Sequence, residues 1–419
     1  MNPLTLRKLE YEKIVEMVTA ECSSSLGKTK AADMMPVTDY DQILAWQQET
    51  SEGVTVRRME PNIPLGGLAD LSRQIRKAQI GGVLEPEEFL QLLDMLKACK
   101  RMSHFFLERK RTYEIPRLEW WAGQITQLPE LEREIDDVIA PEAVVRDSAS
   151  NELLSVRRKI NTLKNRIRER LEHIVRSETS SKYLQDALVT IRNDRYVVPV
   201  KQEYRSQIPG IIHDQSASGA TLFIEPMAVV EMNNDLRKAY STERDEVARI
   251  LQELSAKLMP YVEDLAYNME VLAQIDFIFA KARLSEKMNA VEPKLKSTPE
   301  LNIIKARHPL IDAKKVVPLS ISLGQEFDSV IITGPNTGGK TVTLKTVGLF
   351  ALMAQSGLHI PAEVGSEMGI FHGIYADIGD EQSIEQSLST FSSHMSNIVY
   401  IVNHAGPNTL CLFDELGGG

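Results

Sequence analysis

Eight consecutive residues in the last third of the chain place the tightest constraint on its fold. Residues 334–341 read Gly-Pro-Asn-Thr-Gly-Gly-Lys-Thr, which matches the spacing G-x-x-x-x-G-K-[ST]. An apolar run, residues 329–333, precedes this loop and predicts a buried strand, and residues 340–355 predict a helix after it. A glycine-rich loop between a strand and a helix can cradle phosphate groups. We therefore expect an α/β domain with a phosphate-binding loop in this part of the chain.

The residues of this loop are suited to hold a nucleoside triphosphate. Glycines let backbone N–H groups approach phosphate oxygens, and the start of the helix adds partial positive charge. Lys340 would reach the β- and γ-phosphates, and the Thr341 hydroxyl would bind Mg²⁺. A glycine-rich turn before an ordinary helix is the alternative, and the complete match disfavours it. The predicted ATP- and Mg²⁺-binding residues are Gly334, Pro335, Asn336, Thr337, Gly338, Gly339, Lys340 and Thr341.

A second apolar run, residues 409–413, ends in two carboxylates. In the functional interpretation, Asp414 holds Mg²⁺ through water and Glu415 orients or deprotonates the attacking water. An apolar strand that ends in Asp is common by itself. Its position 74 residues after Lys340 favours the functional interpretation. Glu415 and Lys340 are therefore the predicted catalytic residues.

Two further motifs have open alternatives. Residues 387–394 are rich in serine, which is typical of a helix N-cap. They also fit the signature loop of ABC-type ATPases, in which Ser389 and Thr390 would contact the γ-phosphate held by a second subunit. The order of loop, serine-rich helix start and Asp-Glu strand favours the second interpretation and implies a homodimer. His308 could border the adenine of ATP, and a surface turn explains it equally well.

The rest of the chain predicts long helices with a small β module between them. Residues 151–182 form one helical pattern without Gly or Pro, and short strand-like runs follow, two of them separated by Asn193 and Asp194. Helical periodicity returns over residues 229–288, with a break or kink at Pro260. We predict a multidomain α plus α/β protein with a helical core (1–150), an outgoing lever helix (151–186), a β clamp (187–228), returning lever helices (229–290) and an incomplete ABC-type P-loop ATPase domain (300–419).

The charge distribution singles out the predicted lever and clamp. The whole chain has a formal net charge of −10, which argues against a uniformly basic nucleic-acid-binding protein. Residues 151–205, however, contain 13 Lys or Arg and only 7 Asp or Glu. Such a surface could follow phosphates, although charge on a long helix is more often a solvated face. The candidate nucleic-acid contacts are Arg157, Arg158, Arg166, Arg168, Arg192, Arg195, Lys201 and Arg205.

Cysteine content and hydropathy indicate the compartment. Three widely spaced cysteines, Cys22, Cys99 and Cys411, are typical of reduced thiols and support neither a disulfide framework nor a zinc site. No apolar run approaches the roughly 18 residues that a membrane span needs, and the N-terminus lacks the features of a signal peptide. We expect a soluble cytoplasmic protein without a membrane partner.

Together these motifs resemble the MutS family. The loop at residues 334–341, the Ser389-Thr390-Phe391 sequence and the Asp-Glu-Leu-Gly start at residues 414–417 are similar to that family's phosphate loop, signature and Asp-Glu segment. The helical domain, long helices and β module resemble the MutS core, lever and clamp. The resemblance covers nearly the whole chain, but its specific motifs lie only in the ATPase part.

Departures from the pattern indicate a particular branch of the family. The core starts near residue 4, which leaves no room for a mismatch-reading domain or a connector. A Phe-Leu-Glu sequence at residues 106–108 resembles the mismatch-reading motif, but it lies in a helical pattern and is interpreted as coincidence. The chain thus resembles the second bacterial MutS branch, whose members add a C-terminal Smr domain. Because the sequence ends at Gly419, before the rest of that pattern, we expect a truncated ATPase domain.

The resemblance implies an ATP-dependent nucleic-acid-binding clamp ATPase without mismatch recognition. Its expected target is ribosomal RNA on stalled or collided ribosomes, which the protein would split. One alternative is branched DNA, in a protein that suppresses homologous recombination and is a nuclease through its C-terminal domain. Another is a nucleotide-sensing scaffold without turnover. An SMC-like ATPase is disfavoured because the long helices precede both nucleotide motifs.

Overall fold

The computed structural model describes residues 2–60, 62–109, 112–334, 339–379 and 387–414, with only the backbone described for residues 387–393. The chain divides into two compact units. The first unit comprises Met1–Leu71, Asp94–Gln127 and Glu263–Gly419. The second comprises Ser72–Leu93 and Leu128–Val262, so each unit is assembled from separated parts of the chain.

The first unit begins with short capped helices. The side chains of Asn2, Ser24 and Asp39 accept hydrogen bonds from the free N–H groups at the starts of α1, α3 and α4. Tyr11 and Ile14 of α2 are fully buried, because the helical spacing turns them to one face. The helices outside its α/β part are α1 (Pro3–Lys8), α2 (Tyr11–Glu21), α3 (Ser25–Ala32), α4 (Tyr40–Met59), α7 (Pro116–Gly123) and α11 (Val262–Lys287), with α6 (Pro86–Arg109) contributing to both units.

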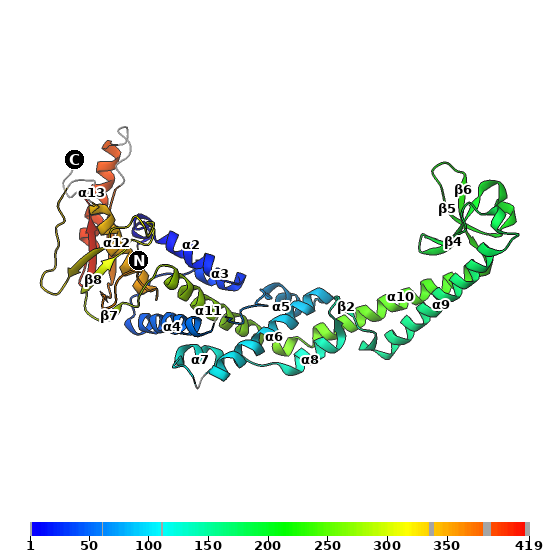
Figure 1. Ribbon diagram of the computed structural model, residues 1–419, viewed down its shortest axis with the longest axis horizontal. Helices are drawn as coiled ribbons and strands as arrows, with labels where there is room; N and C mark the ends of the chain where they lie inside the picture. The colour runs from blue at the N-terminus through cyan, green and yellow to red at the C-terminus, as the bar shows by residue number, and fades with distance from the viewer. Residues whose placement is uncertain (1, 61, 110–111, 335–338, 380–386, 415–419) are drawn as a thin grey trace. The chain divides into compact units, whose positions relative to one another are not determined.

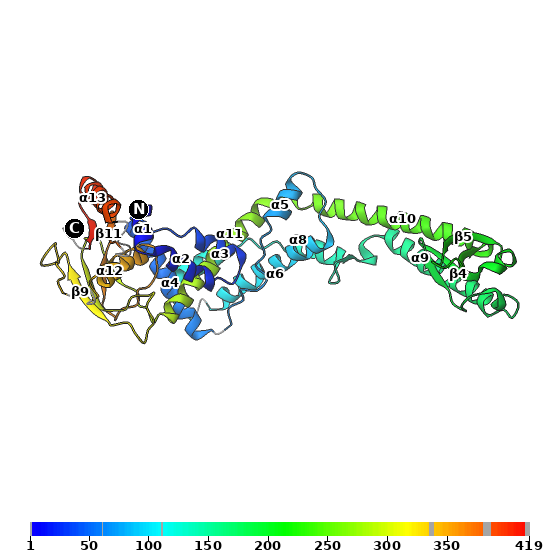
Figure 2. The same cartoon turned by 90° about the horizontal axis from the view of Figure 1, so that it is seen from above.

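Within the part that the structure describes, the α/β part of the first unit contains two sheets. One has the order β7-β10-β8-β9, formed by Lys294–Lys296, Glu367–Gly369, Leu301–Ala306 and Leu319–Leu323. The other pairs β11 (Gly373–Asp377) in parallel with β12 (Thr409–Phe413). Helix α12 (Lys340–Gln355) packs its buried second half into the same core as Leu412 of β12. Helix α13 (Ser387–His404) lies beside β11 and β12, as Figures 1 and 2 show.

The predicted strand at residues 329–333 is wrong. These residues have no regular secondary structure, and Ile331 is 88% exposed. Strand propensity needs a neighbouring strand that supplies hydrogen bonds, and no described strand pairs with this run. The predictions of a helix over residues 340–355 and a strand over residues 409–413 are confirmed.

The second unit contains two long antiparallel helices and a small sheet (Figure 1). Helix α9 (Asn151–Arg176) and helix α10 (Met227–Ala256) pack along a shared apolar core that includes Ile160, Ile167 and Leu236. The other elements are α5 (Ser72–Gln79), α8 (Pro129–Val138), β1 (Ile139–Ala140), β2 (Val144–Val145) and the 3₁₀ turns η1 (Asp147–Ala149), η2 (Ser181–Tyr183), η3 (Gln202–Gln207) and η4 (Met259–Tyr261). The break predicted near Pro260 is confirmed, because α10 ends before η4.

The small sheet has the strand order β3-β4-β6-β5, formed by Thr190–Arg192, Arg195–Lys201, Thr221–Pro226 and Gly210–Gln215. Asn193 and Asp194 join β3 to β4 with φ values of 50° and 59°, which is the left-handed geometry of a tight hairpin. The predicted helix over residues 151–182 is too long, since α9 ends at Arg176. The next residues, Ser-Glu-Thr-Ser, contain side chains that compete with the helical backbone for hydrogen bonds.

Among the described residues, no helix is both long and apolar enough to span a membrane.

Candidate nucleotide site and arm surface

The glycine loop meets helix α12 in a left-handed turn. Gly339 precedes the helix with φ 79°, and Gly334 has φ 148°, conformations that residues with a Cβ rarely adopt. The Lys340 ammonium donates a hydrogen bond to the Gly334 carbonyl oxygen over 2.9 Å. This contact folds the lysine back over its own loop, where a phosphate would lie. Residues 335–338, which include four of the predicted contacts, lie outside the described part.

Asp414 lies directly beside the first turn of α12. It follows the last residue of β12, and its backbone N–H donates to the Asp377 carbonyl oxygen over 2.9 Å. The Thr341 hydroxyl donates to the Asp414 carboxylate over 2.6 Å. Two residues that were separately predicted to hold Mg²⁺ are therefore in contact. Glu415 lies outside the described residues.

The oxygens of Thr341 and Asp414 fit a magnesium ion. Mg²⁺ prefers hard oxygen ligands and usually takes only one or two from the protein, with phosphate oxygens and water completing its shell. Among the described residues no group of three or more His, Cys, Asp or Glu could hold a metal. A site made from one carboxylate and one hydroxyl next to a phosphate loop needs no such group.

His308 follows strand β8 and is buried, with 6% of its surface exposed. Its Nδ1 accepts a hydrogen bond from the Leu310 N–H over 3.3 Å. Burial lowers the pKa of His308, so the ring is neutral near pH 7. The surface-turn alternative does not describe this buried ring, and its proposed contact with adenine stays a prediction.

Asp377, which ends β11 next to Asp414, was not among the residues predicted from the sequence. Its side chain is 2% exposed and accepts hydrogen bonds from three side chains: Lys8, His394 and Asn397. The available signal was the pattern of β11 itself, since this strand ends in Asp as β12 does. Ser389 and Thr390 belong to α13, but their side chains are not described.

Four of the eight predicted nucleic-acid contacts are engaged within the second unit. Arg157 pairs with Glu243 and Asp147, and Arg195 pairs with Glu225. Arg192 stacks over Phe223 and also pairs with Asp214. Lys201 donates to the Lys182 carbonyl oxygen over 3.4 Å. Arg157 and Arg195 stabilise the fold in this way, because carboxylates of the same unit hold both guanidinium groups.

The remaining four, Arg158, Arg166, Arg168 and Arg205, are exposed, and none of them forms an ion pair among the described residues. Two of them belong to a stripe of exposed polar side chains, which we call the arm stripe. Its members are three or four residues apart, so that they follow one face of α9. The arm stripe consists of Arg158, Asn161, Asn165, Arg168, Glu172 and Arg176.

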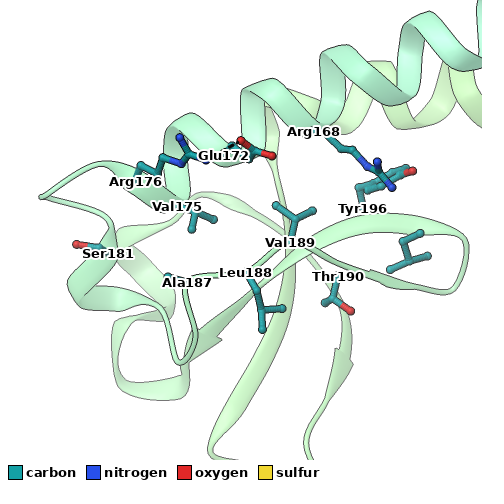
Figure 3. Close-up of a pocket in the computed structure, with 11 residues that line it drawn as sticks. Arg168, Glu172, Val175, Arg176, Ser181, Ala187, Leu188, Val189, Thr190 and Tyr196 are labelled. Carbon is teal, nitrogen blue, oxygen red and sulfur yellow. Dashed lines mark hydrogen bonds and ion pairs between the residues drawn. The ribbon is translucent and has the colours of Figure 1, made fainter.

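The arm stripe ends in an open groove between α9 and the segment that leads into β3. The groove has a volume of about 980 Å³. Figure 3 shows Arg168, Glu172 and Arg176 on successive turns of α9, and these residues line the same groove as residues 187–190. Leu188 and Ile191 give the opposite wall an exposed apolar surface. The groove therefore combines guanidinium donors with an apolar wall. Within it, Glu172 is already paired with Arg176.

Comparison with known proteins agrees with this architecture. The MutS domain V family matches residues 330–419, which contain the glycine loop and the Asp-Glu segment. A protein named endonuclease MutS2 from Alkaliphilus oremlandii (strain OhILAs) is 49% identical over the whole chain, and one from Pelotomaculum thermopropionicum (strain DSM 13744 / JCM 10971 / SI) is 52% identical. A putative endonuclease MutS2 from Bacillus subtilis (strain 168) is 49% identical over 420 aligned residues.

The chain belongs to the MutS family. Within that family it belongs to the MutS2 branch, which the sequence motifs had indicated. It spans about half the length of these curated relatives, 53% of the first two and 54% of the third.

Proposed function

We propose that the protein is an ATP-dependent nucleic-acid-binding clamp ATPase. The observation that carries this proposal is the 2.6 Å contact between Thr341 and Asp414 beside the glycine loop. A hydroxyl and a carboxylate brought together at the start of a helix, next to a loop that can cradle phosphates, fit the hydrolysis of a nucleoside triphosphate.

In this proposal each residue of the site has one task. Backbone N–H groups of the loop and the Lys340 ammonium bind the β- and γ-phosphates. Thr341 and Asp414 would hold Mg²⁺, which would neutralise charge that develops on the phosphates. Glu415 orients or deprotonates the water that attacks the γ-phosphate. Ser389 and Thr390 of a second subunit complete the site, so the active form is a homodimer. The proposed location of this dimer is the cytoplasm.

The proposed target is structured RNA on stalled or collided ribosomes. The dimer would grip this RNA with its arms, each formed by α9, α10 and the small sheet of the second unit, and split the ribosome. The arm stripe supports a nucleic-acid target because its arginines and asparagines are exposed hydrogen-bond donors, and phosphate oxygens accept such bonds. The groove beside Arg168 adds an apolar wall against which an unpaired base could lie. Binding of this kind weakens steeply as salt increases.

Ribosome co-sedimentation of the full-length protein tests this target. One variant carries Arg158→Glu, Arg166→Glu and Arg168→Glu. A control with the same charge change carries Lys28→Glu, Lys30→Glu and Lys314→Glu, all exposed positions in the other unit. We expect the arm variant to lose at least tenfold in affinity at matched salt and the control to stay within about twofold. Equal binding of parent and arm variant would remove the arm from the proposal.

Branched DNA is the second candidate target. It is favoured by the relatives, whose names describe endonucleases, and by an arm surface that suits any phosphate backbone. Competition between four-way DNA junctions and ribosomal particles at one salt concentration separates the two. A preference for junctions of tenfold or more would replace the ribosome with DNA in this proposal.

A further inference from the structure

One buried carboxylate joins three parts of the first unit. Asp377 ends strand β11, and its side chain is 2% exposed. Lys8, the last residue of α1, donates to its Oδ1 over 2.9 Å. Two residues of α13 reach the same group: Asn397 donates to Oδ1 over 2.7 Å, and His394 Nδ1 lies 3.0 Å from Oδ2. The carboxylate therefore links helices that are about 390 residues apart in the sequence.

This arrangement supplies both oxygens of the buried Asp377 carboxylate with hydrogen-bond donors. A buried charged group is costly unless it is paired and hydrogen-bonded, and Lys8, Asn397 and His394 meet that need. Lys8 is the donor with a permanent charge. A buried carboxylate that loses a charged partner becomes expensive to keep in place. The position of α13 therefore depends on a residue of the N-terminal helix.

The imidazole of His394 packs closely against the segment that leaves β11. A Cβ placed on Gly379, in the segment that leaves β11, would lie 2.6 Å from two atoms of that ring. A glycine at this position lets the imidazole of His394 pack against the chain and reach Asp377.

The residues after Lys8 hold the nucleotide-site helix in the same way. Leu9 is fully buried against Gly348 of α12. Glu10 accepts a hydrogen bond from Lys345 of α12 over 3.2 Å. The Tyr11 hydroxyl lies 2.5 Å from the Ser356 hydroxyl at the end of that helix. Residues 8–11 thus contact both α12, which starts at Lys340, and the Asp377 cluster that supports α13.

We propose that Lys8 is a positioning residue of the nucleotide site, which holds α13 in its orientation through Asp377. This inference rests on the proposed ATPase function. Since α13 begins at the serine cluster and not at the phosphate loop, loss of Lys8 slows ATP turnover and leaves ATP affinity unchanged. The N-terminal helix also becomes the route by which the helical part of the unit and the nucleotide site affect each other.

The test compares Lys8→Met and Lys8→Arg in the full-length protein, with Arg7→Met as the matched control. Arg7 lies on the same helix and is exposed, without a side-chain hydrogen bond or ion pair among the described residues. We expect Lys8→Met to lower kcat at least fivefold while the Kd for ATP stays within twofold. Lys8→Arg, which keeps the charge, is expected to recover kcat to within twofold of the parent.

Hydrogen exchange without nucleotide gives a readout that does not depend on turnover. Lys8→Met is expected to speed exchange in α13 at least tenfold relative to Arg7→Met. If the parent neither binds nor hydrolyses ATP, the proposed function fails, and the exchange result still decides whether Lys8 holds α13. Exchange and kcat equal to those of Arg7→Met overturn the inference, and so does an affinity that falls as much as kcat.

Two further variants test the same proposal if the Lys8→Met protein does not fold. Asp377→Asn removes the same ion pair from the other side, and Gly379→Ala displaces the His394 ring. Each is expected to lower kcat at constant Kd. When Asp377→Asn is combined with Lys8→Met, kcat is expected to fall by less than a further twofold, since the two substitutions remove the same ion pair. If the losses in kcat from the two substitutions multiply instead, Lys8 does not act through Asp377.

Discussion

The Thr341 hydroxyl donates a 2.6 Å hydrogen bond to the carboxylate of Asp414, 73 residues further along the chain. The contact exists because β12 ends beside the first turn of α12, so that the strand delivers its terminal carboxylate to the start of the helix. It joins the two halves of the proposed site, and it is the feature on which the first prediction depends.

Removal of either partner is expected to abolish most ATP turnover. Thr341→Ala or Asp414→Asn takes away a ligand proposed for Mg²⁺, and the loss of one such positioned group costs about 100-fold in rate. Phosphate release by the full-length protein measures it. Thr29→Ala is the control, because that exposed hydroxyl bonds, among the described residues, only to the Ser25 carbonyl oxygen. Turnover by Asp414→Asn within twofold of the parent would exclude the assigned role.

The turn after α12 is expected to tolerate only glycine. Gly357 has φ 71°, and a Cβ there would lie 2.4 Å from the Trp46 Cβ. The Thr50 hydroxyl also donates to its carbonyl oxygen over 2.6 Å. Strain and overpacking together predict that Gly357→Ala lowers the free energy of unfolding by about 2 to 4 kcal/mol.

Urea unfolding followed by tryptophan fluorescence measures this effect, because all three tryptophans lie in the first unit. Gly123→Ala is the control, since nothing lies within 4 Å of the added methyl group and the position ends a helix. We expect that control to be neutral or slightly stabilising. Equal midpoints for the two variants would show that the turn can relax.

Acid is expected to destabilise the first unit through His359. The ring is 5% exposed, with Ser285 2.7 Å from Nδ1 and Ser51 2.9 Å from Nε2. Burial, together with the charges of Lys281 and Arg58, lowers its pKa to about 4. The unfolded chain therefore binds a proton below about pH 6.5 while the folded chain does not. Stability present above pH 6.5 is lost as the pH falls towards 4.

Above pH 6.5, the neutral His359 contributes on the order of 3 kcal/mol to the free energy of unfolding relative to pH values below 4. His359→Gln is expected to be less stable than the parent at pH 7, but to lose less stability between pH 6.5 and 4.5. Urea midpoints of both proteins across that range provide the comparison, and other acid-sensitive groups cancel in the difference. Parallel pH profiles would mean that His359 is protonated in the folded protein.

The β module is expected to depend on one buried carboxylate. Glu225 is fully buried and is bonded by Arg195 over 3.0 Å, by Asn233 over 2.7 Å and by His213 over 2.5 Å. Glu225→Gln leaves the Arg195 charge without its partner, at a cost of about 3 kcal/mol. Faster hydrogen exchange over residues 190–226 would report this loss of stability. Glu231→Gln, an exposed position on α10, is expected to exchange like the parent.

The lengths and positions of several elements follow from local sequence. The helix over residues 340–355, the strand over residues 409–413 and the hairpin at Asn193 and Asp194 match the structure because periodicity, turn residues and apolar runs act over short distances. The end of α9 at Arg176 was missed because residues 177–180 contain no Gly or Pro that would mark a helix end, although their side chains favour other conformations.

The failure at residues 329–333 has a different cause. An apolar run predicts a strand, but pairing depends on a partner whose position the local sequence does not contain. The candidate nucleic-acid contacts in residues 151–205 were likewise predicted from residue type alone. Only the fold shows that Arg157 and Arg195 are held by carboxylates while Arg158 and Arg168 are exposed.

By itself, the sequence determined the family motifs, the glycine loop, and the Asp414 and Thr341 candidates, because these depend on residue type and spacing along the chain. Tertiary structure alone decided that Lys8 and Asp377 meet, that Thr341 contacts Asp414, and which arginines face solvent. The physical reason is distance along the chain: these contacts join segments 70 or more residues apart or depend on the burial of neighbouring groups. Only the packing of whole elements fixes such relationships.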